Sequence, residues 1–232
     1  MIGYGILFKD KHSYKDFGIS IKSKEIGIPT VNYVKDSVPF MQGEYDFTAL
    51  YGDVPYGERV ITYVFDIMDY SKEKMNYLKI AIVNWLKGSE KDILRDDAIR
   101  GYYFLAQASD HSFKEDGLIG ELTIKFTCYP FKIGNEKEGE VLWDDFCFLT
   151  DVLQETKFYI EGYKKIKLYS ISSRNIIPTI ICDSDMKLRK KGIEYIIEKG
   201  THKDNRFYLE QENEIEIIGT GTIQFDFKRE VL

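Results

Sequence analysis

Carboxylates are the first residues in this sequence that could do chemistry, since paired Asp or Glu side chains bind cations or cleave glycosides. They occur as Asp96 with Asp97, Asp144 with Asp145, and Asp183 with Asp185. Adjacent residues of an extended chain point to opposite faces, so the first two pairs are poor predicted chelators. Asp183 and Asp185 would share a face, but their segment has the composition of a turn. We interpret all three groups as turn or cap residues, and keep a calcium site at the third as the alternative.

Histidine and cysteine are too few and too dispersed to predict a metal site or a catalytic triad. The chain has three of each: His12, His111 and His202, and Cys128, Cys147 and Cys182. The sequence lacks the Cys-x-x-Cys and Cys-x-x-His spacings that mark structural zinc sites. We interpret the cysteines as reduced structural thiols. The expectation is a protein without metal, without cofactor and without enzymatic activity.

Two further patterns resemble ligand sites. The sequence Gly219-Thr220-Gly221 lacks the third glycine and the following helix of a dinucleotide fingerprint, so it predicts a hairpin turn. Trp143 and the tyrosines of the second half are rings on which a sugar could stack. Core or interface packing is the preferred interpretation of these rings, and carbohydrate binding is the alternative.

Composition narrows the class of protein. The 232 residues carry a net charge of −6, and 15% of them are aromatic, with 17 Tyr and 15 Phe. An acidic surface does not favour general nucleic-acid binding, because phosphate contacts need basic side chains. No apolar run reaches the length of a membrane span, and the first residues do not form a signal peptide. Tyr and Phe favour strands and are frequent at protein interfaces.

The first half predicts a sheet with one helix packed across it. Residues 60–67 form an apolar, β-branched run, and 122–128 alternate with Leu122, Ile124, Phe126 and Cys128 on the inner face. A helix is expected from an N-cap at Ser71 to a left-handed glycine at Gly88. Its apolar stripe comprises Met75, Leu78, Ile82, Trp85 and Leu86.

The second half predicts short strands separated by turns, one of them at Gly162. Strands spaced by about ten residues are typical of a β-sandwich. The polar segment 133–140 is the best candidate for a linker. We therefore expect a mainly β protein with two domains, residues 1–136 and residues 137–232.

Several motifs occur in the order found in the distal tail proteins of tailed bacteriophages. They are Val38-Pro39, Gly43-Glu-Tyr-Asp46, Tyr56-Gly-Glu-Arg59, Leu94-Arg-Asp-Asp97, Tyr102-Tyr-Phe-Leu-Ala106, Thr123-Ile-Lys-Phe-Thr-Cys-Tyr-Pro-Phe131, Asn175-Ile-Ile-Pro178 and Gly219-Thr-Gly-Thr-Ile-Gln-Phe-Asp-Phe227. The glycine often found beside the Asn is missing here. No single motif is specific, but their order resembles that family over nearly the whole chain.

The resemblance implies a tail-tube-like, ring-forming β domain followed by a galectin-like β-sandwich. It implies a homohexameric ring at the distal end of a phage tail, made in the host cytoplasm. The implied partners are the tail tube protein, the tail-tip hub protein and a receptor-binding protein. In this interpretation, residues 38–67 contribute an arm that reaches a neighbouring subunit or the tube. The interface candidates are Tyr45, Tyr51, Tyr56 and Arg59, with pairing of Arg59 inside its own sheet as the alternative.

Two other functions compete with the structural hub. A carbohydrate-binding module would recognise host glycan through the second half. The usual galectin site needs a His, Asn, Arg, Trp and Glu set on adjacent strands, and the second half offers only Trp143 and His202 for its ring residues. A tail-associated hydrolase would need a carboxylate pair or zinc ligands, which the sequence does not predict.

Overall fold

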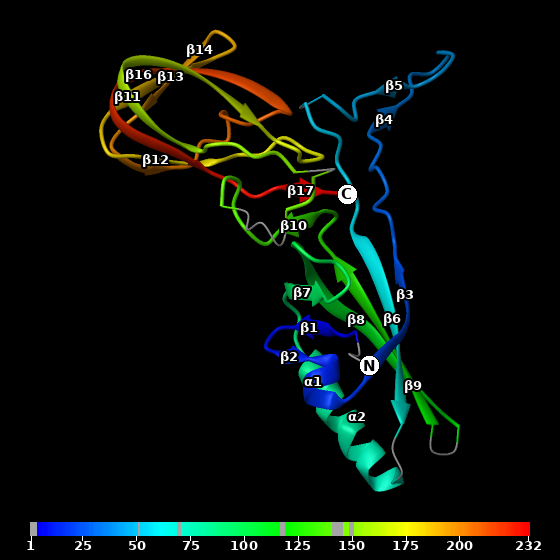
Figure 1. Cartoon of the computed structure of the whole chain (residues 1–232). Coiled ribbons are helices and arrows are strands. Elements are labelled where there is room, and N and C mark those ends of the chain that lie inside the picture. The colour runs from blue at the N-terminus through cyan, green and yellow to red at the C-terminus, as the bar shows by residue number, and fades with distance from the viewer. Residues whose placement is uncertain (1–3, 51, 69–70, 117–118, 141–145, 149–150) are drawn as a thin grey trace. The chain divides into compact units, whose positions relative to one another are not determined.

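The computed structural model describes residues 4–50, 52–68, 71–116, 119–140, 146–148 and 151–232. The chain divides into two compact units, Met1–Lys132 with Leu232, and Ile133–Val231 (Figure 1). Both units are built mainly from β-strands, as the composition and the alternating patterns predict.

The first unit contains one antiparallel sheet with the strand order β2-β1-β7-β8-β9-β6-β3. The strands are β1 (Ile6–Phe8), β2 (Lys11–His12), β3 (Ser20–Ile26), β6 (Arg59–Met68), β7 (Asp92–Asp96), β8 (Tyr102–Asp116) and β9 (Ile119–Cys128). Alternation places Ile61, Tyr63, Phe65 and Ile67 of β6 in the core, opposite the predicted inner face of β9. The inward residues predicted for 122–128 are therefore confirmed.

Helix α2 (Lys72–Leu86) packs on this core through Met75, Ile82 and Trp85 (Figure 1). Ser71 is its N-cap residue, as predicted. The predicted left-handed end at Gly88 is wrong. Lys87 leaves the helix in an extended conformation, and Gly88 has a φ of 137°, far from the left-handed helical region.

A second helix, α1 (Ser13–Phe17), was not predicted from the sequence. It has five residues, too few for a periodic apolar stripe. Gly18 ends it in the left-handed conformation, with a φ of 68°. Phe17 reaches Trp85 of α2, with ring centroids 5.0 Å apart, so packing between the helices compensates for the short length of α1.

Between β3 and β6 the chain leaves the sheet as a long hairpin, residues 28–57, which we call the arm. Its strands are β4 (Lys35–Asp36) and β5 (Tyr45–Asp46). Nearer the sheet, Asn32 N–H donates to the Pro55 carbonyl at 2.8 Å, and Val31 bridges to Tyr56. Figure 1 shows the arm continuing beyond the ends of β3 and β6.

The second unit is organised around two long paired strands, β11 (Lys157–Tyr169) and β16 (Glu212–Asp226). On the edge of β16 that faces away from β11, β13 pairs with the earlier half of the strand and β12 with the later half. Strand β14 then pairs with β13, and β15 pairs with β12. The other strands of this sheet are β12 (Thr179–Cys182), β13 (Met186–Lys190), β14 (Ile193–Ile197) and β15 (Gly200–His202). Two short strands outside it, β10 (Lys132–Gly134) and β17 (Glu230–Val231), pair with each other. The segment predicted as a linker is partly buried, because Ile133 and Glu138 are 8% and 3% exposed.

The β11–β16 ladder bends in its middle, and this bend makes the sandwich. The buried residues on the two sides of the bend, such as Ile160 and Ile166, belong to one core. Near the middle Gly162 pairs with Gly219, and Gly162 is exposed and Gly219 partly exposed. Figure 1 shows the two strands curving together along their length. Phe207 links the layers, with ring centroids 5.1 Å from Tyr195 on β14 and 6.2 Å from Phe225 on β16.

The predicted turns at Gly162 and at Gly219-Thr220-Gly221 are therefore wrong. Both glycine segments lie inside continuous strands. Gly219 has a φ of 150°, and a Cβ there would lie 3.0 Å from Met186 and 3.2 Å from the Asp185 carbonyl. Glycine at this position permits the close approach of β13 to the bend.

Candidate interaction surface

Exposed apolar side chains are gathered on the arm. Phe40 is fully exposed, and Ile28 and Leu50 are 86% and 65% exposed. The other exposed apolar residues of the arm are Tyr33, Val34, Val38, Tyr45, Phe47 and Val54. Such a concentration of uncovered apolar surface is typical of a site that binds another protein.

Hydrogen bonds fix the arm as a hairpin in spite of its exposure. Phe47 N–H donates to the Val34 carbonyl at 2.8 Å, and Val34 N–H donates to Thr48 Oγ1 at 3.0 Å. The side-chain and backbone hydrogen bonds from Thr48 lower the pKa of Asp46 below its usual range. At the tip, Phe40 has a φ of 69°, an uncommon conformation for a bulky residue. The backbone thus presents the apolar side chains outward.

Two of the predicted interface tyrosines are described and lie at different places on the arm. Tyr45 is on β5, 53% exposed, with its ring centroid 6.1 Å from that of Phe47. Tyr56 is half-buried near the base, and its ring meets Phe131 edge-on at 5.4 Å. Tyr51 lies outside the described residues.

Arg59 is placed differently from the tyrosines. It begins β6, pairs in register with Cys128, and is only 3% exposed. Its guanidinium carbon lies 5.7 Å from the centre of the Phe104 ring, and burial lowers the pKa of Arg59. Its Nε is buried without a hydrogen-bond partner among the described residues. Arg59 therefore packs inside its own sheet, directly after the arm.

Sequence reasoning missed the apolar residues that dominate the arm, Phe40 and Phe47 among them. The tyrosines and the arginine of residues 38–67 are the predicted contacts, whereas Phe40 has the largest exposed fraction among its described apolar side chains. The missed signal was Val, Phe and Leu side chains in a stretch interrupted by Gly and Pro. A stretch of this kind cannot form a long strand of a packed sheet.

The carboxylates predicted as solvated turns divide into two kinds. Asp183 and Asp185 each accept a backbone N–H at 2.8 Å, from Thr222 and Lys199, as turn residues do. Asp96 is instead buried in β7, where it accepts from Tyr63 Oη at 2.9 Å and pairs with Lys24 at 2.8 Å. Asp144 and Asp145 lie outside the described residues. Across the described ranges, no group of three His, Cys, Asp or Glu side chains is placed to hold a metal ion.

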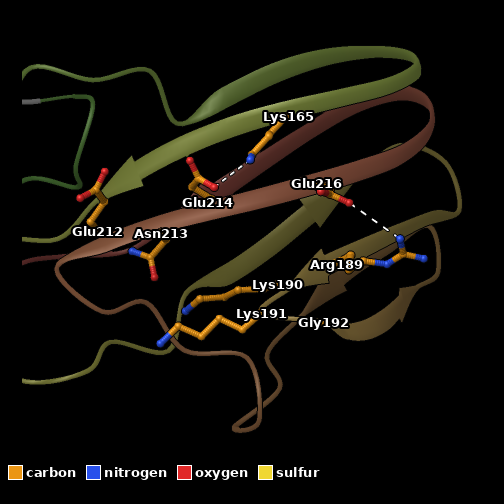
Figure 2. A pocket seen from close by; sticks show the side chains of 9 residues that line it. All are labelled: Lys165, Arg189, Lys190, Lys191, Gly192, Glu212, Asn213, Glu214 and Glu216. Carbon is orange, nitrogen blue, oxygen red and sulfur yellow. Dashed lines mark ion pairs between the residues drawn. The ribbon is translucent and has the colours of Figure 1, made fainter.

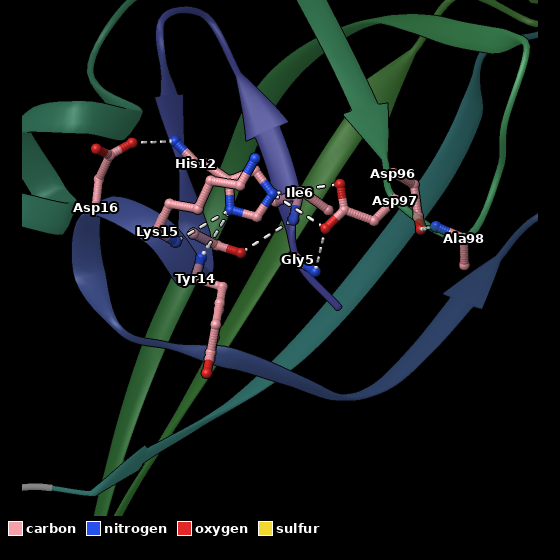
Figure 3. A network of polar contacts seen from close by, with 10 residues as sticks. Gly5, Ile6, His12, Tyr14, Lys15, Asp16, Asp96, Asp97 and Ala98 are labelled. Atoms are coloured by element: carbon pink, nitrogen blue, oxygen red, sulfur yellow. Dashed lines mark hydrogen bonds and ion pairs between the residues drawn. The ribbon is translucent and has the colours of Figure 1, made fainter. Parts of the chain in front are cut away.

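His12 lies in a polar network that contains the three residue types of a catalytic triad (Figure 3). Its Nε2 lies 3.0 Å from Asp97 Oδ2, and Ser13 follows it. However, His12 Nδ1 accepts the backbone N–H groups of Tyr14 and Lys15 at 3.1 and 3.2 Å. Both ring nitrogens are thus engaged, and the imidazole acts as the N-cap of α1 rather than as a base.

A hollow of about 500 Å³ lies on the second unit (Figure 2). Its lining comprises Lys165, Arg189, Lys190, Lys191, Gly192, Glu212, Asn213, Glu214 and Glu216. Lys165 pairs with Glu214 at 2.7 Å, Arg189 with Glu216 at 3.9 Å, and Lys191 with Glu210 at 2.6 Å. These charges neutralise one another, and none of the lining residues is aromatic, so the hollow offers no platform for a sugar ring.

The thiols differ in exposure. Cys128 and Cys182 are buried and Cys147 is exposed. Burial raises the pKa of the Cys128 thiol to about 12, against the opposing effect of the Arg59 charge. Trp143 lies outside the described residues. No described helix is both long enough and apolar enough to cross a membrane.

Comparison with solved structures identifies the fold, through one match with a TM-score above 0.5. No family model and no curated protein matches the sequence. Among solved structures, the crystal structure of the SPP1 Dit protein matches with a TM-score of 0.65 and 10% identity, covering 97% of this chain and 98% of that one. Two structures of the phage P2 baseplate, activated with Ca and with Sr, match with TM-scores of 0.45 and 0.44, identities of 12% and 13%, and at least 97% coverage of both chains. The chain therefore has the mainly β fold of the phage Dit protein, over nearly its whole length.

Proposed function

We propose that this protein is a structural hub of a phage tail tip. The observation that carries the proposal is the near-complete likeness to SPP1 Dit, which is described as a paradigm of the hub of the adsorption apparatus in phages that infect Gram-positive hosts. The motif order of the sequence is an independent support. The protein would be made in the bacterial cytoplasm and reside in the virion tail tip, without catalytic activity.

In this proposal six copies form a ring at the distal end of the tail. The first domain, residues 1–136, makes the ring and contacts the tail tube protein. The galectin-like second domain, residues 137–232, serves as a platform for the tail-tip hub protein and a receptor-binding protein. A ring would also cover strand edges that a single copy leaves open.

The arm is the proposed contact between neighbouring copies. In a ring, each subunit has a neighbour that could bury the exposed apolar side chains of its arm. Phe40, Tyr45 and Phe47 would contact the next copy, with Tyr56 nearer the base of the arm, and Tyr51 stays a candidate for the same contact on its sequence alone. Arg59, which stacks on Phe104, would hold the start of β6 and thereby the direction of the arm.

The ring is tested with the purified full chain by sedimentation velocity and negative-stain imaging, alone and mixed with the tail tube protein. We expect sixfold rings in at least one condition. The variant Phe40→Asp, at the fully exposed tip of the arm, should abolish them, and Tyr77→Asp, on an exposed face of α2, should not. A monomer in both conditions that binds cell-wall glycan on an array would instead support the carbohydrate-binding alternative.

A further inference from the structure

The open sheet edges of this protein differ in how they resist pairing with another chain. An exposed strand edge presents unpaired N–H and C=O groups, and proteins usually protect it with lysine, proline or a bulge. The long edge strand β11 carries Lys157, Lys164, Lys165 and Lys167. Lys164 is exposed, and its Nζ lies 5.6 Å from the centre of the Phe158 ring. The edge strand β3 has two lysines and a register shift between Ile21 and Ser23. Both edges are protected.

The edge strand β14 has none of these protections. Its sequence, Ile193-Glu-Tyr-Ile-Ile197, contains neither lysine nor proline, and it pairs with β13 in unbroken register. Ile193 is 57% exposed and Ile196 is 72% exposed. Among the described residues, no backbone hydrogen bond joins the outer side of β14 to another segment.

An empty groove borders this edge. A hollow of about 510 Å³ is lined by Ile193, Glu194, Tyr195, Ile196, Asp204 and Arg206. A second hollow of about 410 Å³ shares Ile196, Asp204 and Arg206 with it and extends to His202. Asp204 and Arg206 form the side of the groove away from β14, and two contacts fix their position. Tyr195 Oη donates to the Arg206 carbonyl at 3.1 Å, and Asp204 pairs with Arg206 at 2.7 Å.

We propose that β14 and this groove bind an extended segment of a partner polypeptide as an added strand. A row of unpaired N–H and C=O groups is matched only by the backbone of another strand. The charges that line the first hollow are already paired, Glu194 with Lys187 and Arg189 at 3.3 Å, and Asp204 with Arg206. The partner segment is therefore uncharged, with an apolar side chain packed against Ile196.

A second copy of β14 fits this edge less well than a different segment does. Antiparallel pairing of two copies, centred on Tyr195, would set each Glu194 opposite an Ile196. Each exposed Ile196 would then face a carboxylate, whereas a different segment can place an apolar side chain there. The proposal concerns the second unit alone and holds whether or not the protein forms a ring.

The test titrates the full-length protein with the blocked peptide acetyl-Thr-Val-Thr-Val-Thr-amide and follows backbone amide shifts and hydrogen exchange. We expect saturable shifts and slower exchange at β14, and no change at β11. Ile196→Lys should weaken binding at least tenfold. The matched control Ile218→Lys, on the same outer face but on the central strand β16, should bind as the unchanged protein does.

A peptide N-methylated at alternate residues should lose binding, because it cannot complete the backbone ladder. The proposal is overturned if no shift appears at millimolar peptide, if the methylated peptide binds equally well, or if both lysine variants bind alike. It is also overturned if the protein self-associates through β14 and Ile196→Lys abolishes that association, since the occupant would then be a second copy.

Discussion

The arm and the second unit handle apolar side chains in opposite ways. In the second unit, β11 and β16 are long enough to bend at Gly162 and Gly219, so that one sheet covers its own inner face. In the arm, β4 and β5 have two residues each, and all four of these residues are exposed. The apolar residues of the second unit make a core, and those of the arm make a surface. The comparison teaches that strand length and curvature, rather than composition, decide which of the two forms.

The sharpest test of this comparison exchanges one phenylalanine in each region for alanine. Phe225→Ala removes a fully buried ring and should lower the free energy of unfolding by about 3–5 kcal/mol. Phe40→Ala removes a fully exposed ring and should change it by less than about 0.5 kcal/mol. Urea unfolding of the two variants measures both values. A comparable loss in Phe40→Ala would mean that the arm is covered within the single chain.

The bend of the second unit is tested by adding a single methyl group at each paired glycine. Gly219→Ala combines an unfavourable φ with a Cβ 3.0 Å from Met186 and should cost about 3 kcal/mol. Gly162→Ala, which has a φ of 78° and open space around it, should cost only about 1–2 kcal/mol. Denaturant midpoints measure the order of the two losses. Equal losses would show that φ alone matters and that the approach of β13 does not.

Arg59 tests whether the base of the arm depends on a charge or on packing. Arg59→Ala leaves a hole over Phe104 and should lower the free energy of unfolding by about 2 kcal/mol and weaken ring formation. Arg59→Met keeps the volume and removes a desolvated charge, so stability should be unchanged or improved. Thermal unfolding and sedimentation of both variants separate the two effects. Rings that stay intact in Arg59→Ala would leave this residue a role within its own sheet only.

A smaller effect concerns pH and the buried thiol of the first unit. Since burial raises the pKa of Cys128 from 9.0 to about 12, the thiol stays protonated in the folded chain while the unfolded chain loses its proton. The contribution of the protonated thiol to the free energy of unfolding is complete well below pH 9. Above pH 9 it falls with a slope that approaches about 1.4 kcal/mol per pH unit. The slope should be shallower by about 1 kcal/mol per pH unit in Cys128→Ala between pH 9 and 10, where the unfolded thiol is still partly protonated. Cys147→Ala, at the exposed cysteine, is the control and should keep the original slope.

Periodic patterns predicted the parts of the fold that depend on local sequence. The alternation in β6 and β9 and the stripe from Met75 to Leu86 placed the core of the first unit correctly. The N-cap at Ser71 also followed from local sequence, whereas the end of α2 did not, because Lys87 leaves the helix before Gly88.

Features that depend on distant partners were not predictable. Glycines inside long strands have the same local signal as turns, and only the full β11–β16 register distinguishes them. His12 becomes a helix cap because Asp97, far along the chain, fixes its ring. Asp96 is buried only because Tyr63 and Lys24 reach it from other strands. The exposure of Phe40, Ile28 and Leu50 on the arm also has no local signal, since apolar side chains of the same types form the core of the sheet.

The β11–β16 ladder also constrains the order in which the second unit can fold. Lys157 pairs with Gln224 and Tyr169 with Glu212, so β11 emerges from the ribosome well before its partner exists. During that interval β11 has both edges open, and a strand in this state is prone to aggregate with other nascent chains. Its four lysines therefore act before the native state forms, as gatekeepers that keep the waiting strand soluble.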